Sequence, residues 1–272
     1  MAFSQMKISA LALLAGLTLS AGPALAASCG DDGSGFDAWV EDFKQDAAAQ
    51  GISSGTIAAL DGLTYDMSVI KLDRNQKHFK QSFAQFSGRM IPPRVKRAKG
   101  MLAKHASTLA SIEQQYGVPG EVVIAIWGLE TDFGAIRGKL STIRSLATLA
   151  YDCRRSDFFT GQLVDALRVA DRGDIAAAEM RGGWAGELGQ TQFLPSSYIA
   201  FAVDFDGDGR RDLQRSTADV LASTANFLRG HGWQPGQSWE EGSGNYQVIL
   251  QWNKAQVYAK TVGEFARQLS EG

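Results

Sequence analysis

The chain has 272 residues, of which 44% are hydrophobic and 21% are charged, and its formal net charge is −2. This composition is typical of a globular protein and excludes a disordered chain, a collagen-like fibre and a small disulfide-stapled scaffold. The nearly neutral charge comes without a concentrated basic stripe, so nothing in the sequence indicates a nucleic-acid partner.

The first 26 residues have the pattern of an export signal. Lys7 precedes the short apolar run Ile8–Leu19, and Ala24–Ala26 form a small-residue cleavage pattern. The run is shorter than the ~20 residues that a membrane-spanning helix needs, so we expect no transmembrane span. We therefore predict a cleaved signal peptide over residues 1–26 and an exported mature protein over residues 27–272.

The mature part contains two cysteines, Cys29 and Cys153. An even number in an exported protein predicts one disulfide, which would tie the mature N-terminus to the middle of the chain. The alternative is that Cys29 carries a lipid, because Ala26–Cys29 resembles a lipid-attachment sequence. We rank this alternative second, because the position three before the cysteine lacks the usual larger aliphatic residue and because Cys153 would stay unpaired.

Apolar residues recur at helical spacing through most of the mature chain. Phe36, Trp39, Val40 and Phe43 form one such face, and convincing alternating strand patterns are missing from the sequence. The prediction is a mainly α protein with at most a short hairpin in a loop. Further helices are predicted over Asp73–Gly88, Arg94–Tyr116, Gly120–Glu130, residues 142–152, 157–171 and 174–181, Ser216–Leu228 and Tyr246–Leu269.

The helix predicted over Gly120–Glu130 is apolar almost all round, which indicates a position inside the core. Glu130 ends this helix, and apolar surroundings would raise the pKa of its carboxyl group. A carboxyl group that stays protonated near neutral pH can act as a general acid. The alternative is a structural glutamate in an ion pair.

A second catalytic carboxylate is not evident. Ordinary glycosidases use two, but Asp132 is only two positions from Glu130 and would face elsewhere on a helix. Glu121 lies at the opposite end of the same helix. Glu187, in a glycine-rich segment, is the remaining candidate that a fold would be able to bring into a cleft.

The segment that begins at Asp204 matches the opening of a calcium-binding loop, with acidic residues at alternate positions followed by Gly209. The twelfth position holds Arg215 in place of glutamate, so Asp212 or Asp219 must close the coordination shell. The alternative is a solvated acidic turn. The predicted ligand set is Asp204, Asp206, Asp208, Arg210 and Asp219.

The segment Gly182–Tyr198 combines glycines, which allow close backbone approach, with amide and aromatic side chains. Gln192 can hydrogen-bond a polar ligand, and Trp184 and Tyr198 can stack on sugar faces. The segment thus favours a carbohydrate site, with a packed turn as the alternative.

Other catalytic motifs are missing from the sequence. The three histidines have no metal-ligand spacing, and there is no G-x-S-x-G, phosphate loop or dinucleotide fingerprint. We therefore predict no cofactor for catalysis.

Several ordered motifs together resemble one family. The chain resembles the membrane-bound lytic transglycosylase B family of bacterial peptidoglycan lyases over roughly residues 33–269. The motifs are Tyr116–Pro119, Ile126–Gly134, Ser145–Asp152, Trp184–Tyr198, Ala202–Asp204, Ala225–Phe227 and Gly232–Trp233.

This resemblance implies a lysozyme-like catalytic core over residues 116–272, an added helical part over 33–115 and a periplasmic location. It implies that the protein cleaves the β-1,4 bond between N-acetylmuramic acid and N-acetylglucosamine in glycan strands without water, leaving a 1,6-anhydro end. Glu130 would be the single acid/base, and the acetamido group of the substrate would replace a second carboxylate. It also implies a structural calcium ion in the acidic loop and peptidoglycan glycan strands as the partner, and it leaves partners in cell-wall synthesis unspecified.

The resemblance implies substrate contacts at Gln192 and Asn253, to which the sequence adds Trp184, Tyr198, Phe227 and Gly183. This chain departs from the family at three cleft positions, because many members have serine at Gly183 and tyrosine at Phe227 and Trp252. We therefore expect a more open cleft. The alternatives are a muramidase in which Glu187 activates water, and a peptidoglycan-binding protein without catalysis.

Overall fold

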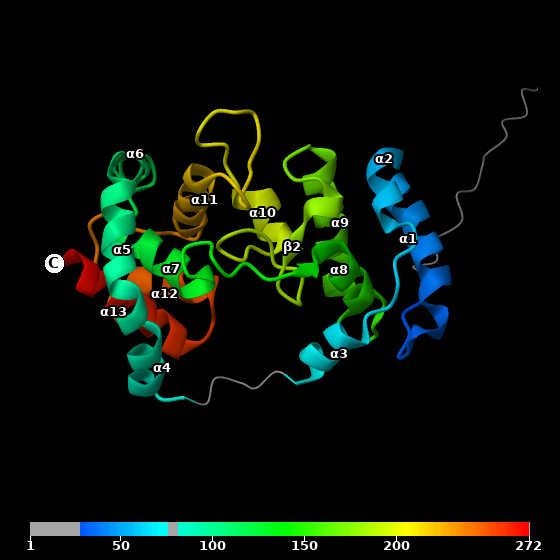
Figure 1. The fold of residues 1–272 in the computed structure, drawn as a ribbon, viewed down its shortest axis with the longest axis horizontal. Helices are drawn as coiled ribbons and strands as arrows, with labels where there is room; N and C mark the ends of the chain where they lie inside the picture. Colours follow the sequence, from blue (N-terminus) through cyan, green and yellow to red (C-terminus); the bar gives the residue numbers. More distant parts are fainter. Residues whose placement is uncertain (1–27, 76–80, 272) are drawn as a thin grey trace, which may run out of the picture.

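The computed structural model describes residues 28–75 and 81–271. Within these residues the chain is mainly helical (Figure 1), which confirms the mainly α prediction. The helices are α1 Phe36–Ala49, α2 Ser54–Ile57, α3 Met67–Arg74, α4 Phe83–Met90, α5 Pro92–Lys104, α6 Ala106–Tyr116, α7 Gly120–Thr131, α8 Thr142–Tyr151, α9 Ser156–Asp171, α10 Pro195–Phe201, α11 Thr217–Gly230, α12 Gly244–Trp252 and α13 Gln256–Ser270. The strands are β1 Leu140–Ser141 and β2 Arg181–Gly182, and three 3-10 turns cover Gly33–Gly35, Ala58–Leu60 and Ala177–Glu179.

The helices form two groups that flank the centre of the molecule (Figure 1). On one side α8 and α9 pack together, and α1 and α3 pack against α8. On the other side α7 is surrounded by α5, α6, α11 and α13. Helix α10 lies between the groups, in contact with both α9 and α11. The predicted division of the chain at residue 116 stays a prediction.

Helix α7 is the buried helix that its composition predicted. Every residue from Val122 to Leu129 is buried, because other helices cover it on all sides. The helix ends at Asp132, whose left-handed backbone (φ 52°) stops the helical hydrogen bonding. The side chain of Asp132 forms an ion pair with Arg97 at 3.0 Å, so it faces away from Glu130 as expected.

Two predicted helices are interrupted. The prediction over Asp73–Gly88 is wrong in its middle, because α3 ends at Arg74 and a capping box at Ser82 starts α4; Phe79 lies outside the described residues. The prediction over Arg94–Tyr116 is wrong at His105, where the chain bends. This bend lets α5 pack against α7 while α6 packs against α11.

A third predicted helix, over residues 174–181, is wrong. Only a 3-10 turn forms there, because Ile175 and Met180 are both buried and five positions apart, a spacing that one helical face does not provide. The chain then enters β2, which pairs antiparallel with β1 in the register Leu140↔Gly182. These two strands are far apart in the sequence, whereas Leu188 and Phe193 form a short local antiparallel bridge within a loop, as the sequence analysis allowed.

The helix predicted over Tyr246–Leu269 is two helices. The chain breaks at Asn253–Ala255 between α12 and α13, where the Asn253 side chain accepts a hydrogen bond from the Ala255 N–H at 3.0 Å. Helix α13 packs along α7, and α12 packs against α13 and α11. The break therefore brings Trp252 and Tyr258 from two directions to the C-terminal end of α7.

The predicted disulfide joins Cys29 to Cys153 and ties the start of the described chain to the end of α8. The Gly30 N–H donates to Tyr151 O at 2.9 Å beside it. The signal peptide predicted over residues 1–26 lies outside the described residues. In the part of the chain that is described, no helix is long and apolar enough to cross a membrane.

Candidate active site

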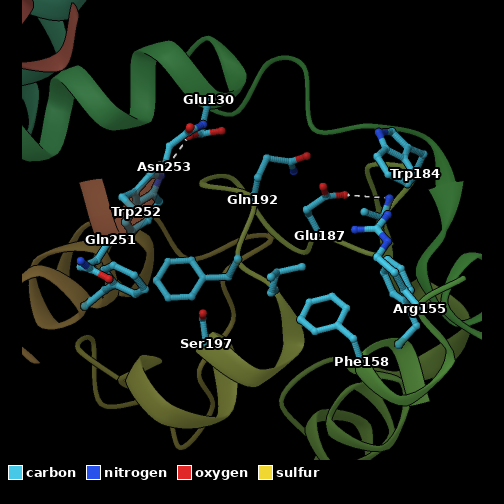
Figure 2. Close-up of a pocket in the computed structure, with 15 residues that line it drawn as sticks. Glu130, Arg155, Phe158, Trp184, Glu187, Gln192, Ser197, Gln251, Trp252 and Asn253 are labelled. Atoms are coloured by element: carbon cyan, nitrogen blue, oxygen red, sulfur yellow. Dashed lines mark hydrogen bonds between the residues drawn. The ribbon is translucent and has the colours of Figure 1, made fainter. Parts of the chain in front are cut away.

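A groove of about 380 Å³ lies where the two groups of helices meet (Figure 2). Its walls come from the end of α7, the start of α9, the loop between β2 and α10, helix α11 and the break between α12 and α13. Its lining residues are Glu130, Arg155, Phe158, Phe159, Trp184, Ala185, Glu187, Gln192, Phe193, Leu194, Ser197, Phe227, Gln251, Trp252 and Asn253.

Glu130 stands at one end of this groove, at the last turn of α7. Its Oε1 accepts hydrogen bonds from the indole Nε1–H of Trp252 at 2.9 Å and from the hydroxyl of Tyr258 at 2.7 Å. Both donors reach the same oxygen, so Oε2 is the oxygen left to carry a proton. No lysine, arginine or histidine in the described chain pairs with this carboxyl group, so the structural ion-pair alternative has no support.

The surroundings keep the pKa of Glu130 above its usual value. The main cause is burial among apolar groups, and the negative charge of Glu187 adds to it. The hydrogen bonds from Tyr258 and Trp252 act in the opposite direction, because they stabilise the ionised form. This carboxyl group is suited to donate a proton near neutral pH and to take one back.

Gln192 lies on the opposite wall of the groove, in the loop before α10 (Figure 2). Its backbone is left-handed (φ 55°), and its side-chain NH₂ donates to Arg137 O at 3.2 Å and to Gly189 O at 2.9 Å. The amide nitrogen is therefore committed to the protein. The amide oxygen is the part of the Gln192 side chain that is available as an acceptor in the groove.

The loop that carries Gln192 is joined directly to α7. Trp127 Nε1–H donates to the side-chain oxygen of Gln190 at 3.1 Å, and the Thr131 hydroxyl donates to the Gln190 backbone oxygen. Gly134 leaves the space for this contact, since a Cβ there would stand 2.2 Å from the Gln190 side-chain oxygen. These contacts fix the positions of Gln192 and Glu130 relative to each other.

Phe227 forms part of the floor of the groove and is 7% exposed. Its ring packs edge-on against Trp252 with centroids 4.9 Å apart, and against Phe193 at 5.9 Å. Its ring also stacks on His231 with centroids 4.1 Å apart, so Phe227 is held from behind while it contacts the indole that hydrogen-bonds Glu130. Asn253 lines the groove beside Trp252, and Trp184 lies toward the opposite end (Figure 2).

Gly183 lies behind Glu187 and is not among the lining residues. A Cβ at this position would stand 2.3 Å from Glu187 Oε2 and 3.3 Å from Gln192 Oε1. The missing side chain therefore gives space to the Glu187 carboxyl group, and the expectation of a more open cleft stays a prediction.

Tyr198 is not in the groove, so its predicted stacking on sugars is wrong. The side chain is fully buried, and its hydroxyl donates to the backbone oxygen of Arg211. Helix α10 packs against α9 and α11, and Tyr198 is on the covered face of this short helix. Burial raises the pKa of its phenol far above the ordinary value.

The acidic loop brings three of the predicted metal ligands together. Oxygens of Asp204, Asp206 and Asp219 lie within 4.8 Å of one another. Asp208 lies outside this cluster and accepts a hydrogen bond from the Arg210 N–H at 2.8 Å. The carbonyl oxygen of Arg210 is the atom of that residue with the chemistry of a calcium ligand.

The fold places Asp219, and not Asp212, next to Asp204 and Asp206. Asp212 Oδ1 accepts from the N–H groups of Gln214 at 2.9 Å and of Arg215 at 3.0 Å, so it holds the turn before α11. Asp219 is fully buried, and burial raises the pKa of its carboxyl group. Asp219 is the acid that faces Asp204 and Asp206.

Three residues of the site escaped the sequence analysis as functional positions. Tyr258 lies among the apolar positions of α13 and has the pattern of a core residue. Arg155 and Phe158 line the far end of the groove, at the start of α9. Charge and aromatic character just after Cys153 were the only available signal. The four groove residues predicted from sequence that do line it are Gln192, Asn253, Trp184 and Phe227.

A helical core whose groove combines the Glu130 carboxyl group, at the end of a buried helix, with amide and aromatic side chains fits the lysozyme-like class of glycan-cleaving folds. The comparisons with known proteins agree with this class. The chain belongs to the family described as Transglycosylase SLT domain, which matches residues 35–243.

A curated relative is membrane-bound lytic murein transglycosylase B of Escherichia coli K12. It is 40% identical over 124 residues, an alignment that covers 45% of this chain and 34% of that protein. The chain therefore matches about a third of the length of this relative.

Solved structures match over most of the chain. SltB3 of Pseudomonas aeruginosa, in complex with NAG-anhNAM-pentapeptide, is 34% identical with a TM-score of 0.82, and the match covers 88% of this chain and 80% of that one. The Escherichia coli lytic transglycosylase Slt35, in complex with calcium, is 23% identical with a TM-score of 0.78, covering 90% of this chain and 96% of that one. The second likeness concerns the fold alone.

Proposed function

We propose that this protein is a lytic transglycosylase that cleaves peptidoglycan glycan strands between N-acetylmuramic acid and N-acetylglucosamine. The observation that carries the proposal is the carboxyl group of Glu130, which stands in the groove with a raised pKa and with two neutral donors on one oxygen. Family membership and the bound muropeptide of the SltB3 structure support the choice of substrate.

In the proposed reaction Glu130 acts first as an acid and then as a base. Its proton passes to the O4 atom of the leaving sugar as the C1–O4 bond breaks, with assistance from the acetamido group of the muramic acid. The O6 hydroxyl of the same muramic acid then attacks C1 and gives its proton to the Glu130 carboxylate. The product is a 1,6-anhydro end, and Glu130 is returned to its starting state.

The donors to Glu130 suit both steps. Trp252 and Tyr258 stabilise the carboxylate that exists between the two proton transfers, while burial stabilises the acid before and after them. Gln192 and Asn253 are proposed to hydrogen-bond the sugars, and Trp184 to stack on a sugar face at the far end of the groove. Phe227 is proposed to act by holding the ring of Trp252 in place.

A second candidate is a muramidase of the same fold, because Glu187 places another carboxyl group in the groove. In that reaction Glu187 activates a water molecule, and the products carry reducing ends. Both candidate reactions cleave the same glycosidic bond and use Glu130 as the acid. They differ in the mass of the product by one water molecule.

The test is mass spectrometry of the soluble products released from purified sacculi by the mature protein and by its Glu130→Gln variant. We expect anhydro-ended muropeptides from the wild type and a loss of at least about 1000-fold in the variant, in keeping with removal of a general acid. Reducing ends would establish the muramidase. Binding without release of products, by both proteins, would favour the non-catalytic alternative.

We propose in addition that the acidic loop holds a structural calcium ion. The cluster of Asp204, Asp206 and Asp219 fits a hard cation that prefers oxygen ligands, and a structure of similar fold contains calcium. The ion would neutralise three carboxylates and tie the loop to α11, without a part in the reaction. An increase of the melting temperature with calcium and a decrease with chelator test this proposal.

We propose a periplasmic location, on the pattern of the first 26 residues and on the substrate. The name of the Escherichia coli relative describes a membrane-bound protein. The size of the mature chain by mass spectrometry, after expression with residues 1–26, tests whether the signal is removed.

A further inference from the structure

Glu187 is a carboxyl group of the groove that the single-acid reaction does not use. It lies in the loop between β2 and α10 and lines the same groove as Glu130 (Figure 2). Its side chain turns back over its own loop, where Oε2 accepts a hydrogen bond from the Ala185 N–H at 3.1 Å. No cationic side chain in the described chain forms an ion pair with it, so Oε1 is available to a ligand.

The backbone of Glu187 is held firmly against β2. A Cβ at Gly182 would stand 1.6 Å from the Glu187 backbone oxygen, so the two segments approach as closely as a glycine allows. The next residue, Leu188, exchanges two backbone hydrogen bonds with Phe193, at 2.7 and 2.8 Å. The loop therefore fixes the direction in which the Glu187 side chain leaves the backbone.

Gly183 and Glu187 form one structural unit. Any side chain at position 183 would enter the space that Glu187 Oε2 occupies, and its Cβ would also approach Gln192 Oε1. The Glu187 carboxyl group thus occupies the space that a side chain at position 183 would fill. The pair puts a polar group on the groove wall next to Gln192, at the point where the resembled family carries a serine.

We propose that Glu187 contacts the substrate and accepts a hydrogen bond from the acetamido N–H of the muramic acid whose C1 atom is attacked. This inference rests on the proposed transglycosylase function. The donors of Gln192 are committed to Arg137 and Gly189, and those of Trp252 and Tyr258 to Glu130. Glu187 is an acidic acceptor in the groove, and an amide N–H is a donor that every N-acetylated sugar carries.

The contact would assist the first step of the reaction. As the C1–O4 bond breaks and the Glu130 proton moves to O4, the acetamido carbonyl oxygen bonds to C1 and positive charge spreads to the amide nitrogen. A carboxylate on the N–H stabilises this charge. When O6 then attacks C1, the acetamido oxygen leaves, the O6 proton passes to Glu130, and Glu187 remains ionised throughout.

The charged groups that face the groove together with Glu187 are Glu130 on α7 and Arg155 at the start of α9. Burial raises the pKa of Glu187, and the charge of Glu187 raises the pKa of Glu130. Activity then needs Glu187 ionised and Glu130 protonated. Two interacting acids with these roles give a bell-shaped pH profile, with an acid limb that depends on Glu187.

The experiment is the pH dependence of anhydro-muropeptide release from sacculi by the Glu187→Gln variant. We expect a rate about 10- to 100-fold lower, because the amide oxygen can still accept from the acetamido N–H but no longer brings the negative charge that strengthens this bond. We also expect the acid limb to disappear and the alkaline limb to move to lower pH, because the charge that raises the pKa of Glu130 is gone. The matched control is Glu179→Gln, which removes an exposed carboxylate outside the groove that pairs with Arg215.

A second set of variants tests the pairing with Gly183. Gly183→Ser alone displaces the carboxyl group, so we expect it to lower the rate with unchanged melting temperature. Gly183→Ser combined with Glu187→Ala restores a polar group without a clash, so we expect the double variant to exceed Glu187→Ala in rate. This comparison holds even if Glu187→Gln folds poorly.

The outcomes separate the two proposals. If the wild type releases no anhydro products, the transglycosylase function is wrong and this inference falls with it. If the wild type releases them and Glu187→Gln has the same rate and pH profile, only the inference is overturned. A double variant no faster than Glu187→Ala would contradict the pairing with Gly183.

Discussion

Glu130 is half-buried and Asp219 is fully buried, and both carboxyl groups have raised pKa values, yet the protein holds them in different ways. The donors to Glu130 are two side chains on the C-terminal helices, Trp252 and Tyr258. The donors to Asp219 are backbone N–H groups of the acidic loop, from Phe205 at 2.8 Å and Asp212 at 2.9 Å. Glu130 faces a groove, whereas Asp219 is completely enclosed.

Because of this difference, we expect substitutions near Glu130 to affect the reaction and substitutions at Asp219 to affect stability. A side-chain donor can be removed while the backbone around the acid stays in place, so changes near Glu130 are expected to alter its pKa and the reaction. Backbone donors cannot be removed, and they lose their acceptor if the acid is removed. Changes at Asp219 are therefore expected to alter stability first.

The largest expected effect is that of Asp219→Ala on stability. The substitution leaves buried backbone N–H groups without an acceptor and removes one member of the acidic cluster. We expect a loss of about 2–4 kcal/mol in the free energy of unfolding, measured by urea denaturation. The control is Asp208→Ala, in the same loop but outside the cluster, for which we expect a loss under about 1 kcal/mol.

Asp219→Asn refines the same prediction. The amide oxygen still accepts from the backbone, so most of the stability is expected to remain, while the increase of melting temperature with calcium is expected to shrink. Equal stability of the Asp219→Ala and Asp208→Ala variants would contradict the view that backbone donors make Asp219 structural.

An intermediate effect is expected at Tyr258, and it concerns activity. The Tyr258 hydroxyl stabilises the ionised form of Glu130, so Tyr258→Phe raises the pKa of Glu130 further. Because Glu130 then stays protonated to higher pH, we expect the alkaline limb of the activity profile to move to higher pH. The rate is expected to fall about tenfold, since the carboxylate between the two steps loses a donor.

The matched control for this variant is Tyr246→Phe. Tyr246 is also buried, but its hydroxyl contacts Gln256 and not Glu130. An unmoved alkaline limb in Tyr258→Phe, or the same movement in both variants, would contradict the assignment of Tyr258 to Glu130.

The sequence predicted the parts of the site that depend on local patterns. Helix α7 is recognisable because a helix that is apolar on all sides is predicted to lie in the core. A glutamate at the end of such a helix is unusual, so Glu130 is identified as a candidate. The disulfide followed from counting cysteines. The acidic loop followed from residue spacing, although spacing alone left the choice between Asp212 and Asp219 open.

The parts that depend on breaks and on tertiary packing were not predictable. No glycine or proline marks the interruption at Asn253–Ala255, and apolar spacing continues through it, so Tyr258 was assigned to the core. Tyr198 is an aromatic residue of the kind that stacks on sugars, but the packing of α10 buries its side chain in the core. The close approach of Gly183 and Glu187 depends on the Glu187 side chain folding back over its own loop. A periodic sequence pattern cannot predict such a contact.

The smallest expected effect is that of Ser216→Ala, which compares a side-chain donor with the backbone donors inside the acidic loop. Ser216 caps α11 by accepting from the Asp219 N–H at 3.2 Å, and its hydroxyl donates to Asp206 Oδ2 at 2.6 Å. This is a side-chain donor to an acid of the loop, like the donors to Glu130. Ser216→Ala is expected to cost about 1–2 kcal/mol in urea denaturation, with the pH profile of activity unchanged.

Ser243→Ala is the control, because Ser243 caps α12 by accepting from the Tyr246 N–H at 3.1 Å and contacts no acid in the described chain. Both variants lose one cap, so the excess loss in Ser216→Ala measures the bond to Asp206. An excess of about 0.5–1 kcal/mol would mean that a side-chain donor also stabilises the acidic loop. No excess would mean that the loop is stabilised by its backbone donors and by the ion. Side-chain donors would then stabilise the acid at Glu130 and not the acids of the loop.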